Sequence, residues 1–179
     1  MKKIIVGFLF ILLGISFGEE KKLISIDYFS GYGYAKLERQ DDYIFSPFCI
    51  DFTYPIPFSK KDSQFQFQLE PFFSYVSQPD TNAEIGLSFF FKYRFFKEEK
   101  LQPYIRFGSG IIYITQDTYE QSTNYNFVSQ LGTGLSYFLK NNFGVAVEYR
   151  YRHISNAGIK EPNSGIDSRL FLFGIIHSI

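Results

Sequence analysis

His153 and Ser155 stand two residues apart in the C-terminal part of the chain, and together they have the chemistry of a nucleophilic pair. A serine hydroxyl keeps its proton at neutral pH and is a weak nucleophile, but a neighbouring imidazole can accept that proton during attack. Residues i and i+2 of a strand share a face and lie about 6.6 Å apart, from a rise of about 3.3 Å per residue. If both residues lie on one strand, the spacing therefore allows His153 to take the proton of Ser155 while the serine oxygen attacks an acyl carbonyl.

A third group, usually a carboxylate, must hold the imidazole and stabilise its protonated form. Glu148 lies an odd number of residues from His153, so we expect it on the opposite side of the strand. Asp167 opens the next extended segment and can lie beside His153 in an antiparallel pair. We therefore favour Asp167 as the acid and keep Glu161, in the intervening loop, as the alternative.

The same stretch offers hydrogen-bond donors for the oxyanion that such an attack creates. They are the side-chain amides of Asn156 and Asn163 and the backbone amides near Gly158 and Gly165. A simpler interpretation is that His153 belongs to a polar belt at a strand end and that Ser155 begins a loop, since such residues are common there. Spacing alone does not separate the two interpretations.

The segments that must position these residues alternate between apolar and polar side chains from residue 22 onward. Polar, Pro- or Gly-containing breaks separate them, and they cover residues 23–36, 43–54, 64–77, 84–96, 103–115, 126–139, 143–155 and 168–178. About nine to eleven tilted residues cross the hydrocarbon of a membrane, and small barrels have an even number of strands. The sequence therefore predicts an all-β fold, an eight-stranded antiparallel transmembrane β-barrel.

The aromatic content decides which face of these strands points outward. The chain has 23 Phe and 14 Tyr, whereas an eight-stranded barrel encloses an interior only wide enough for side chains. The apolar face must therefore point into lipid and the polar face into the barrel. The side chains expected to pair inside are Lys92, Arg94, Arg106, Gln130, Glu148 and Arg150.

The same parity places His153 and Ser155 on the lipid-facing side of segment 143–155, whose other odd-numbered residues are Phe, Val and Tyr. On such a face a polar pair loses its hydration, which costs free energy unless the pair binds another molecule. Short connections at 57–63, 97–102 and 140–142 contrast with longer polar ones at 116–125 and 156–167. If the short ones are periplasmic turns, His153 and Ser155 lie near the outer leaflet.

The N-terminal residues predict secretion. Lys2 and Lys3 precede an apolar stretch over residues 4–15 and small residues up to Gly18, so we expect a signal peptide at 1–18 and a single barrel domain at 19–179. No run of eighteen apolar residues follows, so helical membrane spans are not expected. Lysine plus arginine and aspartate plus glutamate both number 18, so no basic surface suggests a nucleic-acid partner.

Metal and disulfide chemistry have little support in the sequence. Cys49 is the one cysteine of the chain, which excludes an intrachain disulfide. The two histidines, His153 and His177, belong to opposite ends of the barrel wall, which argues against a metal site that they share. We therefore expect neither a metal nor an organic cofactor.

Residues 153–167, His-Ile-Ser-Asn-Ala-Gly-Ile-Lys-Glu-Pro-Asn-Ser-Gly-Ile-Asp, closely resemble the signature of the PagL-type lipid A 3-O-deacylases, outer-membrane esterases of Gram-negative bacteria. By position, the resemblance implies that His153 is the general base, Ser155 the nucleophile and Asp167 the orienting acid. It also implies that Asn163 donates to the oxyanion and that the amide of Asn156 supports the site. The departure is at Asp167, where members of that family carry glutamate. Aspartate has a stem one methylene shorter, so the strand must bring it closer to the imidazole.

The resemblance implies a carboxylic ester hydrolase. Its substrate would be lipid A, as part of lipopolysaccharide, cut through an acyl-serine intermediate at the 3-hydroxyacyl ester of position 3. The alternatives are a non-catalytic small outer-membrane barrel with a structural or adhesive role and a lipid A acyltransferase. Besides this substrate, the partners considered are outer-membrane lipid and a second copy of the barrel in a homodimer.

Overall fold

The computed structural model describes residues 22–39, 41–56, 64–97 and 99–179. The expected signal peptide at residues 1–18 lies outside these ranges. In the described ranges, no helix is long and apolar enough to cross a membrane.

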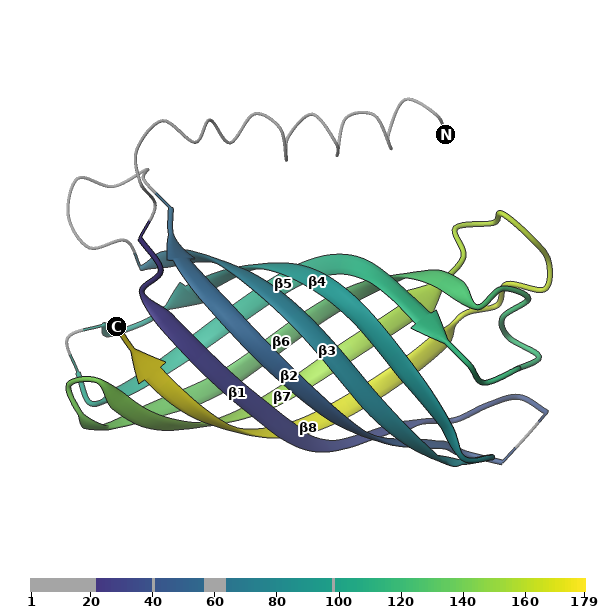
Figure 1. Ribbon diagram of the computed structural model, residues 1–179, viewed down its shortest axis with the longest axis horizontal. Coiled ribbons are helices and arrows are strands. Elements are labelled where there is room, and N and C mark those ends of the chain that lie inside the picture. Colours follow the sequence, from purple (N-terminus) through teal and green to yellow (C-terminus); the bar gives the residue numbers. More distant parts are fainter. Residues whose placement is uncertain (1–21, 40, 57–63, 98) are drawn as a thin grey trace.

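Eight strands form a closed antiparallel barrel, in which each strand pairs with the next in sequence and β1 closes on β8 (Figure 1). The strands are β1 (Ser25–Ala35), β2 (Tyr43–Pro55), β3 (Phe65–Gln78), β4 (Asn82–Arg94), β5 (Leu101–Ile114), β6 (Tyr125–Lys140), β7 (Phe143–Ser155) and β8 (Ile166–Ser178). This confirms the predicted eight-stranded fold. β8 begins two residues earlier than the predicted segment 168–178, so Asp167 lies within the strand.

Side chains alternate between the outer wall and the interior, as the period-two pattern predicts. In β7 the even-numbered residues from Gly144 to Ile154 are buried, whereas Tyr149 and Tyr151 keep 39% and 42% of their surface exposed. The Phe and Tyr side chains of the outer wall also contact one another across strands, as between Tyr149 and Phe171, whose ring centroids are 5.1 Å apart. The lipid-facing orientation of the apolar face follows from this arrangement.

A network of buried ion pairs fills the middle of the barrel. The Arg106 guanidinium lies 2.7 Å from Asp51 and 2.9 Å from Glu70. Arg150 lies 2.7 Å from both Glu70 and Glu148. All five side chains are at most 1% exposed, so each buried charge has an opposite charge in direct contact, as burial requires.

The remaining side chains expected inside also point inward. Gln130 accepts a hydrogen bond of 3.1 Å from Arg150, and Lys92 lies 3.9 Å from Asp27. Arg94 is half-buried near the end of β4, where it donates a hydrogen bond of 3.2 Å to Gln102. The ion pairs thus continue the polar filling toward the barrel end that holds the C-terminus.

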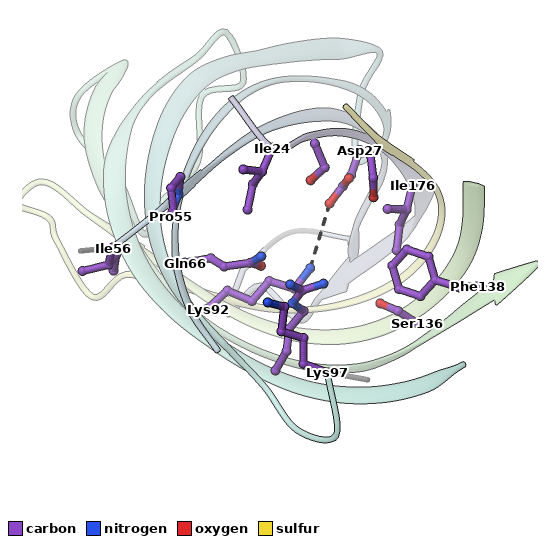
Figure 2. Close-up of a pocket in the computed structure, with 13 residues that line it drawn as sticks. Ile24, Asp27, Pro55, Ile56, Gln66, Lys92, Lys97, Ser136, Phe138 and Ile176 are labelled. Atoms are coloured by element: carbon purple, nitrogen blue, oxygen red, sulfur yellow. Dashed lines mark ion pairs between the residues drawn. The ribbon is translucent and has the colours of Figure 1, made fainter. Parts of the chain in front are cut away.

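The two ends of the barrel differ in their connections. The C-terminus, the start of β1 and the turn at 141–142 share one end, and the connections at 115–124 and 156–165 share the other (Figure 1). A cavity of about 450 Å³ opens at the C-terminal end, lined by Asp27, Gln66, Lys92, Ser136 and Phe138 among others (Figure 2). Because β7 runs away from this end, His153 and Ser155 lie at the opposite one.

The central network makes a stability prediction. Arg106→Met leaves Asp51, Glu70 and Glu148 buried with one guanidinium fewer, so we expect the free energy of unfolding to fall by about 3–5 kcal/mol. Urea unfolding of the refolded barrel in lipid vesicles, followed by circular dichroism, measures this change. Leu131→Met on the outer wall is the matched control and should cost less than about 1.5 kcal/mol. Equal losses in the two variants would contradict a stabilising role of the network.

Candidate active site

His153 and Asp167 are directly opposite each other in the β7–β8 pair. Their side chains leave the outer wall together, and the His153 Nδ1 atom lies 2.7 Å from Asp167 Oδ1. The imidazole is 40% exposed and the carboxylate 62%. Register accounts for this contact, because directly opposed residues bring their Cβ atoms to within about 5.5 Å. The shorter stem of aspartate therefore suffices at this position.

The contact also fixes the roles of the two ring nitrogens. An ionised carboxylate can only accept hydrogen bonds, so Nδ1 carries the proton and donates it to Asp167. Nε2 of the neutral ring is then a free acceptor. An imidazole held in this way can take a proton from a hydroxyl that approaches Nε2.

Tyr151 is a member of this cluster that the sequence did not reveal. Its hydroxyl donates a hydrogen bond of 2.6 Å to Asp167 Oδ1, the same oxygen that faces His153. Tyr151 and His153 share the outer face of β7, and Tyr151 lies diagonally across from Asp167. The parity of β7 placed Tyr151 on this face, but only the register shows that it reaches the carboxylate.

Gly165 packs against the imidazole. Its φ of +87° lies in the left-handed region, and a Cβ built there would stand 2.6 Å from His153 Cε1 and 3.3 Å from Nε2. Both the backbone conformation and the closeness of the ring therefore require glycine. Its backbone N–H donates to the Glu120 carbonyl at 3.4 Å, so this amide already has a partner.

Ser155 is the last residue of β7 and lies on the same face as His153, half-buried and opposite Phe127 of β6. Its hydroxyl makes no hydrogen bond with His153 or with any other residue that the structure describes. The structure thus brings His153 and Asp167 into contact and leaves Ser155 one step further along the same face. Catalytic hydrogen bonds are often long in the absence of substrate and shorten in its complex.

The two asparagines have different surroundings. Asn156 is fully buried, and its side-chain amide donates to the Lys160 carbonyl at 2.7 Å and to the Ser122 hydroxyl at 3.4 Å. Both of its donors are therefore used to shape the loop. Asn163 accepts a hydrogen bond of 2.8 Å from the Asn156 backbone through Oδ1, while its Nδ2 donors have no partner among the described residues. Asn163 is the better placed of the two to donate to a ligand.

The connection between β5 and β6 supports the loop that carries Asn163. The Gln121 amide donates to the Ile154 carbonyl at 3.2 Å, and Gln121 forms a β-bridge with Asn163. The Ser122 hydroxyl donates to the Lys160 carbonyl at 2.9 Å. These contacts join segments more than thirty residues apart, so no local sequence pattern reveals them.

The other two carboxylates considered for the site lie elsewhere. Glu148 is buried in the barrel interior with Arg150 and Arg106. Glu161 is exposed in the 156–165 loop, where it makes no hydrogen bond or ion pair with a described residue. The cavity of Figure 2 lies at the opposite barrel end. The side chains of His153 and Asp167 are exposed on the outer wall, so they are accessible from outside the barrel.

Comparisons with known proteins agree with this fold and with the residue pattern. A family model described as lipid A 3-O-deacylase (PagL) matches residues 49–175, which include the whole 153–167 stretch. Among curated protein sequences, none matches the chain.

Two solved structures of outer-membrane barrels are similar to this one. The outer membrane enzyme PagL has a TM-score of 0.60 at 18% identity, over 84% of this chain and 97% of that one. Neisserial surface protein A (NspA) has a TM-score of 0.62 at 13% identity, over 90% of this chain and 100% of that one. At such identities the likeness shows the shared barrel fold alone.

Proposed function

Because the chain belongs to the lipid A 3-O-deacylase (PagL) family and is a barrel of the bacterial outer membrane, we propose that it hydrolyses the 3-hydroxyacyl ester at position 3 of lipid A. The observation that carries the proposal is the contact between His153 and Asp167 on the lipid-facing wall, with Ser155 next on the same face. Lipid A occupies the outer leaflet, so its ester can reach this wall by lateral diffusion.

In the first half of the reaction, Ser155 Oγ attacks the ester carbonyl and its proton passes to His153 Nε2. Asp167 stabilises the resulting imidazolium through Nδ1. Asn163 Nδ2 donates a hydrogen bond to the oxyanion of the tetrahedral intermediate. The bond between the carbonyl carbon and the sugar oxygen then breaks, and His153 gives its proton to that oxygen. The products of this half are the free sugar hydroxyl and an acyl-serine.

In the second half, a water molecule attacks the acyl-serine while His153 Nε2 accepts its proton. The intermediate collapses, the Ser155 oxygen leaves and takes the proton back, and a 3-hydroxy fatty acid departs. The polar loop at 156–165, beside the exposed imidazole, gives water access to this step. In a lipid acyltransferase, the second of the two alternatives, another lipid would replace this water.

The Ser155 hydroxyl must turn toward Nε2 when the ester binds, since the two do not hydrogen-bond in the structure. Rotation about χ1 moves a serine hydroxyl between staggered positions without backbone movement. The half-buried position of Ser155 at a strand end leaves room for that rotation. We therefore assign the closing of this contact to substrate binding.

Mass spectrometry of lipid A from cells that produce the wild type or Ser155→Ala tests the function. We expect the wild type alone to remove one hydroxyacyl chain, because the variant lacks the attacking oxygen. Ser30→Ala, on the outer face of β1, is the control and should act as the wild type does. A lipid A that gains an acyl chain would instead indicate acyl transfer. Unchanged lipid A in cells that produce the wild-type protein would indicate a non-catalytic barrel.

The orienting acid has its own test. Asp167→Ala removes the partner of Nδ1, so kcat should fall on the order of 10³–10⁴-fold, whereas Glu161→Ala should change kcat by less than about twofold, in line with surface substitutions. Release of 3-hydroxy fatty acid from purified lipid A in detergent micelles measures both. The opposite ranking would transfer the role to Glu161.

Tyr151 acts as a positioning residue through Asp167. Tyr151→Phe removes one of the two hydrogen bonds to Asp167 Oδ1. Because a hydrogen bond to a charged group contributes enough free energy for about a tenfold effect, we expect kcat to fall about tenfold and KM to stay unchanged. Tyr149→Phe is the matched control on the same strand and face, and it should change neither constant. Equal effects of the two variants, or an effect on KM alone, would remove Tyr151 from the site.

A further inference from the structure

Arg169 is an exceptional residue of the outer wall. The outward-facing residues of the eight described strands are apolar, aromatic, small or hydroxyl-bearing, apart from His153, Asp167 and Arg169 near one barrel end and His177 at the opposite end. Asp167 has two hydrogen-bond partners, Tyr151 and His153. Arg169 makes no hydrogen bond or ion pair with any described residue, and it is exposed.

Its position ties Arg169 to the catalytic cluster. It lies two residues after Asp167 on the same face of β8, about 6.6 Å along the strand. Its opposite residues are Tyr151 on β7 and Tyr34 on β1. Arg169 therefore lies between two tyrosines, one step further from the 156–165 loop than Asp167 and His153.

An unpaired guanidinium is unfavourable against hydrocarbon, but its long stem can carry the charge toward the headgroups. There it needs an anion. The planar fork of donors matches phosphate oxygens, to which arginine binds through two parallel hydrogen bonds. The glucosamine backbone of lipid A carries phosphate monoesters, and the ester that the site would cut is on the same backbone.

We propose that Arg169 binds a phosphate group of the lipid substrate and so places the ester at Ser155. This inference rests on the proposed function and names the group by which the substrate is recognised. A phosphate on a neighbouring lipid is the second source of the same chemistry. A purely internal effect of Arg169 on Asp167 is the other explanation that the experiment must separate.

The experiment compares wild type, Arg169→Gln and Arg169→Lys on lipid A and on the same lipid A after removal of its phosphates, in micelles of a non-ionic detergent. We expect Arg169→Gln to raise KM about tenfold for the phosphorylated substrate and to leave both constants unchanged for the dephosphorylated one. Arg169→Lys keeps the charge without the planar fork, so its KM for the phosphorylated substrate should lie between those of the wild type and Arg169→Gln. Lys100→Gln, which removes a charge at the opposite barrel end, should match the wild type on both substrates.

Two outcomes of this kinetic comparison would overturn the proposal. If Arg169→Gln changed kcat or KM equally on both substrates, Arg169 would act through Asp167 or the barrel. If the wild type had the same kcat and KM on both substrates, the phosphates would not be recognised. Adding phosphatidylglycerol to the micelles tests the second source: an Arg169 effect that appears only with this lipid would assign the contact to a neighbour.

A binding measurement keeps this test separate from catalysis. Native mass spectrometry of the Ser155→Ala barrel, with and without Arg169→Gln, reports retention of the two lipids without turnover. A preference for phosphorylated lipid A that disappears with Arg169→Gln supports the proposal even if the wild type releases no fatty acid, in which case the proposed function alone fails. Equal retention of both lipids would refute phosphate binding by Arg169.

Discussion

The narrow interior of an eight-stranded barrel constrains every other feature of this protein. There is room inside for one layer of side chains from each strand, and buried charges with aromatic rings among them take that room. Arg106 lies 4.4 Å from the centre of the Phe90 ring while it contacts Asp51, Glu70 and Glu148. A core filled in this way leaves no passage for a lipid, so chemistry on a large amphiphile has to take place on the outer wall.

Placing the site on the wall makes strand register the main positioning device. His153 faces Asp167 because β7 and β8 pair without a bulge along their shared length. On the interior side of the same strand, Arg152 binds Glu84 at 2.7 Å, and Tyr43 donates to that carboxylate at 2.8 Å. These buried contacts hold β7 against the far wall of the barrel, so the exposed imidazole stands on a rigid strand although its own surroundings are open. Precision at the site thus comes from the opposite face of the strand that carries it.

The sequence predicted the strands and the direction of their faces because a period of two is local and repeats in every segment. It also predicted that Asp167 can lie beside His153, since consecutive strands of a barrel are neighbours. It did not reveal Tyr151, whose contact depends on the register, or the packing of Gly165 against the imidazole ring, which depends on the path of the loop. The support from Gln121 and Ser122 joins connections distant in sequence, and the buried role of Asn156 follows from that packing. What escaped the sequence is therefore tertiary contact between loops and diagonal contact between strands.

A polar group on a lipid-facing wall is costly unless it has a partner, and this cost separates structural groups from those available to a ligand. Tyr151, Asp167 and the His153 Nδ1 atom satisfy one another. Four groups at the outer end of β7 and β8 have no partner among the described residues: His153 Nε2, the Ser155 hydroxyl, Asn163 Nδ2 and the Arg169 guanidinium. They are an acceptor, a hydroxyl, a neutral donor and a cation, which under the proposed function would meet a hydroxyl proton, an acyl carbon, an oxyanion and a phosphate. A phosphorylated glycolipid ester has all the groups needed to complete this set, and this complementarity is the physical basis of the proposed substrate.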